Sequence, residues 1–151
     1  MSSTKETILA ALETALKSFF DGGAATNQIK GSNIARWRKN MLTTPPTETP
    51  AITIIDPGDS TPEVVDSEYV RYLSEIDLHL LVKVNSPTDT LDGLNGLIAD
   101  LQSFCDTATI DAALLNIHVA GVSSFNFYQD KNMADAVISL DLRHVRVRSA
   151  V

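Results

Sequence analysis

The stretch YVRYLSEIDLHLLVKVN, residues 69–85, decides the fold. Apolar residues recur at every second position through most of it, and the residues between them are mainly charged or polar. The apolar positions are Val70, Tyr72, Ile76, Leu78, Leu80, Val82 and Val84, and the polar ones are Arg71, Glu75, Asp77, His79 and Lys83. This period of two predicts a strand with one buried face and one face that meets water or a partner.

The length of this strand raises a second question. A single strand from Tyr69 to Val84 would span about 53 Å, roughly three times the usual length. Either the strand bends at Ser74, or its first half projects beyond the body of the protein as an arm. A projecting arm needs a neighbour to cover it.

Other segments surround this strand with helices and strands. Apolar residues at three- and four-residue spacing predict a helix over 4–20, ended by Asp21–Gly23, and a second over 86–106. β-branched and alternating runs predict strands over 51–56, 116–129 and 136–150. In the last strand the apolar phase shifts near Arg143–His144, which predicts a bulge or an exchange of faces.

Residues 22–50 show no sustained period, and their second half is rich in proline. Within them, only residues 32–42 could form a short helix. We therefore expect one α+β domain over 1–151, with an irregular basic and Pro-rich segment at 22–50. Its sheet is mixed or antiparallel, of about four strands in the order α-β-β-α-β-β, with two main helices on one face and a long projecting strand or hairpin arm.

Charge and composition narrow the class of protein. The 151 residues carry a net charge of −7, and a basic start and a basic end flank a strongly acidic middle. This balance disfavours a dedicated DNA-binding domain. One cysteine excludes an internal disulfide, the start lacks the pattern of a signal peptide, and no apolar run approaches the roughly 20 residues that span a membrane. We expect a chain that is made in a cytoplasm and has no membrane contact.

The sequence contains no recognisable motif for a catalytic or metal site. The three histidines, His79, His118 and His144, lie on separate predicted strands and lack the close spacing of zinc ligands. Cys105 lies on the apolar stripe of the second helix beside acids, which favours a core thiol over a nucleophile. We expect no enzyme and no cofactor. An acidic loop does not match calcium-binding spacing and is expected to meet water or a basic partner; its residues are Asp56, Asp59, Glu63, Asp66 and Glu68.

The segment NIARWRKN, residues 33–40, places the only tryptophan among cations: Arg36, Trp37, Arg38 and Lys39. Three interpretations stay open, namely contact with nucleic acid, docking on a protein, and a solvated loop with Trp37 packed inward. Trp and Arg are favoured at interface hot spots, which inclines us to a docking segment.

Three arginines lie near the end of the sequence: Arg143, Arg146 and Arg148. They either protect an exposed edge strand by charge or form a basic edge that docks on an acidic patch, including that of an identical subunit. Together with the polar positions Arg71, Glu75 and Asp77 of the long strand, they are candidate subunit contacts.

The layout resembles the tail terminator, or tail completion, proteins of long-tailed bacteriophages, the class that includes the lambda-type terminator. The likeness is carried by the order of five segments, which are ETILAALETALKSFF, AITIID, VRYLSEIDLHLLVKV, DTLDGLNGLIADLQSF and AVISLDLRHVRVR. The basic segment and the Pro-rich stretch have no counterpart that we can match.

The resemblance implies a homo-oligomeric ring, usually a hexamer, that caps the tail tube, stops its polymerisation and joins the tail to the head connector. Its implied partners are further copies of itself, the tail tube protein and the connector or stopper protein, with no membrane. An acidic lumen would suit passing DNA, and transient non-specific contact with the genome stays open. The implied location is the tail or neck of a virion assembled in the host cytoplasm. The alternatives are another neck, tail or contractile-tube component of related fold, and a small cytoplasmic enzyme or ligand-binding domain.

Overall fold

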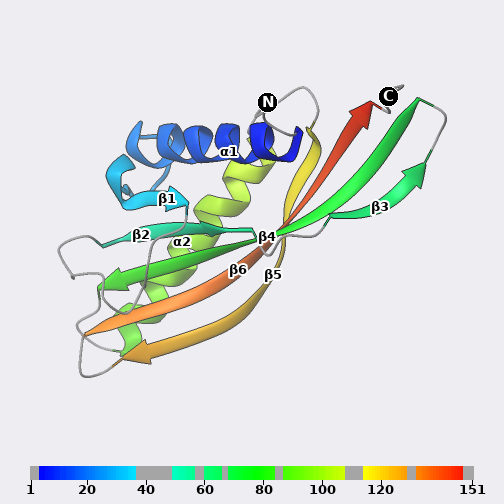
Figure 1. Cartoon of the computed structure of the whole chain (residues 1–151). Coiled ribbons are helices and arrows are strands. Elements are labelled where there is room, and N and C mark those ends of the chain that lie inside the picture. Colours follow the sequence, from blue (N-terminus) through cyan, green and yellow to red (C-terminus); the bar gives the residue numbers. More distant parts are fainter. Residues whose placement is uncertain are drawn as a thin grey trace.

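A long pair of strands runs through the centre of the molecule (Figure 1). A computed structural model describes residues 4–36, 49–56, 60–65, 68–83, 87–107, 114–128 and 132–147. The helices are α1 (Thr4–Asp21) and α2 (Pro87–Thr107), with a short 3-10 turn η1 (Gly31–Asn33). The strands are β1 (Ile34–Arg36), β2 (Ala51–Ile55), β3 (Ser60–Val65), β4 (Tyr69–Lys83), β5 (Leu114–Tyr128) and β6 (Met133–Val147).

All six strands form one mixed sheet in the order β1-β2-β4-β6-β5, with β3 paired to β4 off this path. Only the β1–β2 pair is parallel. β4 and β6 pair along their full length, from Tyr69 opposite Val147 to Lys83 opposite Met133. The expected α+β class, mixed sheet and two helices are therefore confirmed, while the sheet has six strands rather than four.

β4 changes its second neighbour half-way along. Its first half pairs with β3 from Val70 to Ser74, and its second half pairs with β2 from Asp77 to Leu81. The β3–β4 hairpin extends beyond α1 and α2 (Figure 1). We call this hairpin, β3 with residues 69–74 of β4, the arm. Of the two possibilities for the long strand, the projecting arm is the one that the structure shows.

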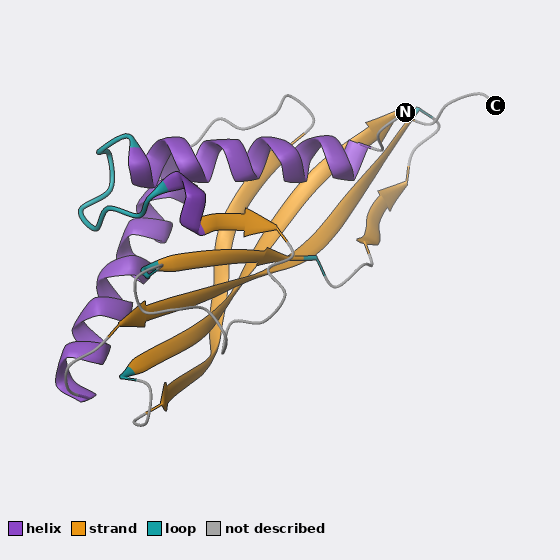
Figure 2. Cartoon of the chain, turned by 60° about the vertical axis from the view of Figure 1, so that its left-hand side comes forward, coloured by secondary structure: helices purple, strands orange, loops and turns teal. Residues whose placement is uncertain are grey.

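Both helices cover the same face of the sheet (Figure 2). Their apolar stripes meet alternate residues of β2, β4 and β6 in one continuous core, which contains Leu12 and Phe20 of α1, Leu97 of α2, Leu78 of β4 and Ile138 of β6. These side chains are almost completely buried. The stripes that spacing predicted in both helices are thus the surfaces that hold the helices on the sheet. No helix in the described part of the chain is long and apolar enough to cross a membrane.

Two of the strands lie in segments where irregular structure was expected. The proposed short helix at 32–42 is wrong for its described part, because η1 leads into β1 and β1 pairs with β2 from Ile34 opposite Ile52. The acidic loop is also partly a strand, since Glu63 lies within β3. Both strands are short and depend on pairing with a distant segment, which local propensity does not reveal.

The last strand differs from expectation in two ways. β6 lies between β4 and β5, so it is not an edge strand. Its pairing with β4 continues without a register shift through Arg143 and His144, so the predicted bulge is not in β6. The irregularity lies opposite, in β5, where the register shifts between Leu114 and Asn116.

A buried carboxylate fixes the connection after α1. Asp100 of α2 accepts hydrogen bonds from the backbone N–H of Thr26 (3.1 Å) and of Asn27 (2.9 Å), and from Asn27 Nδ2 (3.0 Å). Gly96 makes room for this contact, because a Cβ there would lie 2.8 Å from Asn27 Nδ2. Gly96 therefore serves the packing of α2 on this connection.

We predict that Asp100→Ala lowers the free energy of unfolding by about 2 kcal/mol, because two backbone donors and one amide donor lose their buried acceptor. Urea titration followed by circular dichroism measures the change. Asp106→Ala is the matched control, since Asp106 is exposed on the same helix and its loss should shift stability by less than about 0.5 kcal/mol. Equal effects of the two substitutions would contradict the role of Asp100.

Candidate interaction surfaces

The sheet has one face on the side away from both helices, and we call it the open face (Figure 2). Residues directly opposite in an antiparallel pair point to the same side, so the pairs Glu75–Asp141 and Asp77–Ser139 both lie on it. Ser139 Oγ donates a hydrogen bond to Asp77 Oδ1 at 3.1 Å. His118 Nε2 lies 3.3 Å from Asp141 Oδ2. The polar positions of the long strand thus form a connected polar surface with acidic groups at its centre.

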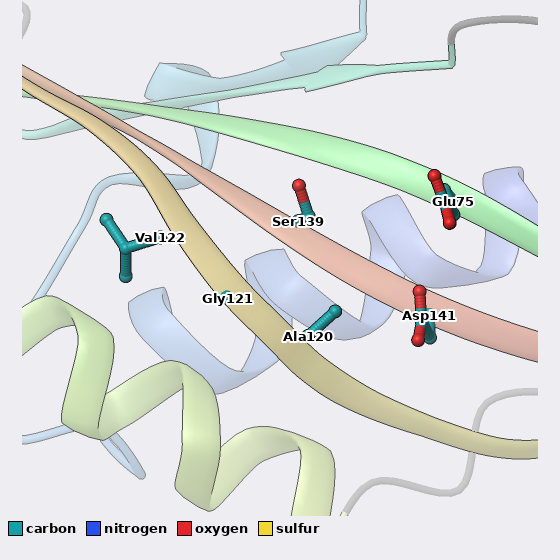
Figure 3. A pocket seen from close by; sticks show the side chains of 6 residues that line it. All are labelled: Glu75, Ala120, Gly121, Val122, Ser139 and Asp141. Atoms are coloured by element: carbon teal, nitrogen blue, oxygen red, sulfur yellow. The ribbon is translucent and has the colours of Figure 1, made fainter.

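A hollow of about 310 Å³ lies on this surface, lined by Glu75, Ala120, Gly121, Val122, Ser139 and Asp141 (Figure 3). β5 carries one extra residue here, Ala120. Val119 pairs with Leu140 and Gly121 with the next residue of β6, Ser139, so Ala120 has no paired position on β6. The described residues contain no group of three or more His, Cys, Asp or Glu side chains placed to hold a metal ion. The hollow is therefore a surface feature lined by the two carboxylates of Glu75 and Asp141.

The arm end of the open face carries arginines that already have partners. Glu63 Oε1 accepts a hydrogen bond from Arg143 Nε at 3.1 Å and lies 3.8 Å from Arg71 Nε. This arrangement ties β3 to β6 across β4. Because all three side chains are partly exposed, the ion pairs contribute little to stability, and they mainly orient the arm. Arg71 and Arg143, both proposed as subunit contacts, thus have an intramolecular role.

On the helix-covered side, a buried polar cluster marks the base of the arm. His144 Nε2 lies 2.9 Å from Ser74 Oγ, and the imidazole stacks on Tyr72 with ring centroids 5.7 Å apart. The guanidinium group of Arg146 lies over the Tyr72 ring, with its Cζ atom 5.8 Å from the ring centroid. A histidine can activate a neighbouring serine hydroxyl as a nucleophile, but Ser74 and His144 are both buried, and a substrate would not reach them in this structure. The cluster therefore serves packing at the point where the strands leave the body.

The environment of His144 disfavours its charged form. Burial lowers the pKa of His144, and the nearby Lys5 charge lowers it further. Its Nδ1 atom is also buried and has no hydrogen-bond partner among the described residues. The side chain is therefore neutral at pH 7.

The basic segment is described only in part. Arg36 donates hydrogen bonds from both terminal nitrogens to Glu6 of α1, with 2.8 Å between Nη2 and Oε2. This bidentate pair raises the pKa of Arg36 and lowers that of Glu6. Lys5 likewise lies 2.9 Å from Asp56. Arg36 and Asp56 thus hold α1 against the sheet. The remaining predicted residues of these segments lie outside the described ones: Trp37, Arg38, Lys39, Asp59, Asp66 and Arg148.

The cysteine is placed as expected. Cys105 is partly buried and packs against the core. Burial, with a smaller contribution from Asp106, raises its pKa to about 11. A thiol with this pKa is protonated at neutral pH and is a poor nucleophile. Glu68, the remaining residue of the acidic loop, is exposed just before β4.

Sequence reasoning missed one class of surface residue, the exposed large apolar side chains. Among the described residues they are Val65 (62% exposed), Tyr69 (47%), Val122 (38%), Phe125 (45%) and Phe127 (38%). The last two belong to the run SSFNFYQ, whose alternation predicted a strand. Alternation cannot tell whether the apolar side of a strand meets the core or extends past it at a sheet edge.

The fold occurs in solved structures, although neither a family model nor a curated protein matches the sequence. A chain in the virion of a native gene transfer agent particle is similar, with 7% identity and a TM-score of 0.55, and the match covers 92% of each chain. A second solved chain is 13% identical with a TM-score of 0.52, and that match covers 99% of both chains. At these identities the likeness shows a shared fold over nearly the whole length.

We predict that acid weakens the base of the arm through His144. The folded chain binds the His144 proton less readily than the unfolded chain, whose histidine pKa is about 6.5. The stabilising effect of neutral His144 is therefore complete above that pH and is lost as the pH falls through the lowered pKa of the folded chain. Urea midpoints between pH 8 and pH 5 should fall less steeply for His144→Gln than for the wild type. Identical slopes would contradict the prediction.

Proposed function

We propose that this chain is a structural protein of a phage-like virion that forms a closed ring on the end of the tail tube. The ring ends tail polymerisation and offers a surface to the head connector. The protein acts by binding alone, and its partners are copies of itself, the tail tube protein and the connector or stopper protein. Its place is the tail or neck of the virion.

The observation that carries this proposal is the fold shared with a chain of a virion particle over 92% of each chain. The match includes 92% of both chains, so it involves the whole arrangement of helices and sheet rather than one common motif. The order of elements that resembles the tail terminators is also present, from α1 through the long β4 to β6.

The geometry supports an assembling protein. The arm extends beyond the helices, and β5 leaves one edge of the sheet free of a further described strand (Figure 1). The described residues show a connected polar surface on the side of the sheet away from the helices. A closed ring requires two different surfaces on each copy, and an arm and a distant sheet edge satisfy that requirement.

The open face suits the lining of a DNA passage. Its middle carries the carboxylates of Glu75, Asp77 and Asp141. Carboxylates repel the DNA phosphates and keep a passing genome from binding to the wall. In such a ring the open face is directed toward the channel, and the helices are directed outward.

Assembly tests this proposal. We expect the purified full chain to give one closed oligomer by native mass spectrometry and annuli by negative-stain electron microscopy, with six copies as the first expectation. Added to growing tubes of tail tube protein, it should cap them and shorten them. A monomer both alone and with tubes would overturn the proposal. Rings that form but do not bind the tubes or shorten them would instead assign the protein to another part of the neck or tail.

Arg146 of β6 and Arg148, which lies outside the described residues, give a second test. Arg146→Glu combined with Arg148→Glu should weaken self-association, because the pair would contribute positive charge to a subunit contact. Circular dichroism should show an unchanged fold, since Arg146 is exposed and exposed charge changes cost little stability. Lys83→Glu is the matched control, because Lys83 is exposed at the other end of the same sheet. Unchanged oligomer size in the double variant would rule out a docking role for these arginines.

A further inference from the structure

A buried histidine lies where the long strand changes its neighbour. β4 pairs with β3 from Val70 to Ser74 and with β2 from Asp77 onward. His144 of β6 is 4% exposed and Ser74 is 2% exposed, and 2.9 Å separates His144 Nε2 from Ser74 Oγ. This contact joins β6 to the last residue of β4 that pairs with the arm strand β3. It therefore lies at the boundary between the arm and the body.

The surroundings of the His144 ring accommodate one proton but not two. Its Nε2 atom faces the Ser74 hydroxyl, whereas its Nδ1 atom is buried and has no hydrogen-bond partner in the described part of the chain. The arrangement thus favours the neutral ring with its proton on Nε2, from which it is donated to Ser74. A charged imidazole carries N–H groups on both nitrogens. Its Nδ1–H group would be buried without an acceptor, which is unfavourable.

The charges that face this ring are positive. The charge of Lys5, at the start of α1, lowers the pKa of His144, although burial is the larger cause. The guanidinium group of Arg146 lies over Tyr72, on which His144 stacks. On β5 the position opposite His144 is the apolar Leu114. A proton taken up by the ring would therefore add a third positive charge to this place.

The carboxylates on the surrounding elements are paired with other cations. The pairs are Asp56 with Lys5 (2.9 Å), Glu63 of β3 with Arg143 (3.1 Å) and Glu6 of α1 with Arg36 (2.8 Å). Among the described residues, no carboxylate is placed to balance a charge on His144. The protonated ring is therefore stable only after it leaves its buried position.

We propose that the base of the arm is a proton-operated switch, in which the uptake of one proton by His144 opens the arm while the body stays folded. The proton adds to Nδ1, and the ring moves out so that water can solvate the new N–H group and its charge. This movement breaks the contact with Ser74 and the stack on Tyr72. Open means here that β3 and residues 69–74 of β4 lose their protected pairing. The inference goes beyond the proposed ring, because the switch acts in a single copy whether or not copies assemble.

The opening is confined to the arm because the aliphatic core ends at its base. On β4 the core cluster begins at Ile76, and on β6 its last member is Leu142. Val70 is buried in the arm but lies outside this cluster. The arm extends beyond both helices (Figure 1), and the ion pair that ties it to β6 is partly exposed. A segment with few buried apolar contacts opens at a lower free energy than the core.

The direction of the pH dependence follows from the two states of His144. In the open arm the ring is hydrated and has the ordinary histidine pKa of about 6.5. In the closed arm burial and Lys5 lower this pKa. The opening equilibrium is therefore constant above about pH 6.5 and increases as the pH falls from there to the lowered pKa. Because one proton is taken up, the increase is at most about tenfold per pH unit.

Hydrogen exchange read by mass spectrometry tests the switch in the full chain. Between about pH 7.5 and about pH 5, where most carboxylates stay ionised, peptides that cover 60–74 should lose protection beyond the intrinsic effect of pH. Peptides of α2 and of residues 76–82 should keep their protection. In His144→Gln the arm should be equally protected at both pH values, because glutamine takes up no proton. His118→Gln is the matched control, since His118 lies half-exposed on the open face beside Asp141 and its loss should leave the wild-type response intact.

The outcomes decide the inference in either direction. An arm that keeps its protection at the lower pH, or an arm that responds equally in His144→Gln, would overturn the switch. Joint loss of protection in the arm and the body would show global unfolding and overturn a local opening.

A second measurement needs no variant and covers the case in which His144→Gln fails to fold. An NMR titration of the wild type should show one histidine ring that titrates below about pH 6.5 together with the backbone amides of the arm. Arm amides that change with a midpoint different from that of every histidine ring would overturn the proposal.

Discussion

The pairing of β4 with β6 is the constraint on which the rest of the structure depends. All 15 residues of each strand are in register, from Tyr69 opposite Val147 to Lys83 opposite Met133. Because no bulge interrupts this pair, the two faces of the sheet keep their identity from one end to the other. The helices occupy one face, and the polar positions Glu75, Asp77, Ser139 and Asp141 are held together on the other.

A strand pair longer than the helices that cover it produces two regions with different physical chemistry. Where α1 and α2 lie on the sheet, the covered side is aliphatic, as at Leu78 and Ile138. Toward the arm, the same side of the same strands carries Tyr72, His144 and Arg146, which form a stacked polar cluster. The aliphatic core thus ends at the base of the arm, and aromatic and polar packing around the buried His144 takes its place there.

Much of this could be predicted from the sequence, because both helices and the long strand have strong apolar periods. The edge position of β5 could not, since strand order depends on pairing between distant segments. β3 was hidden by Pro62 and by its acidic neighbours, and β1 is only three residues long. The apolar phase shift at Val145 suggested a bulge in β6. The register shows instead that β6 continues past the helices. The alternation of apolar residues in that part of the strand therefore no longer marks the side that is buried in the core.

The edge strand β5 shows how the sheet limits uncontrolled pairing at its edge. Its register with β6 shifts three times, at 114–116, 119–121 and 122–124, and each shift gives β5 one extra residue. Such bulges interrupt the row of free backbone groups that would otherwise accept any extended chain. A partner of this edge must then be recognised mainly through side chains. Phe125 and Phe127 lie beyond the last of these shifts, in the part of β5 where pairing with β6 is regular and side-chain positions are well defined. Specific contact through side chains, with non-specific strand addition suppressed, is what the proposed ring would require of its subunits.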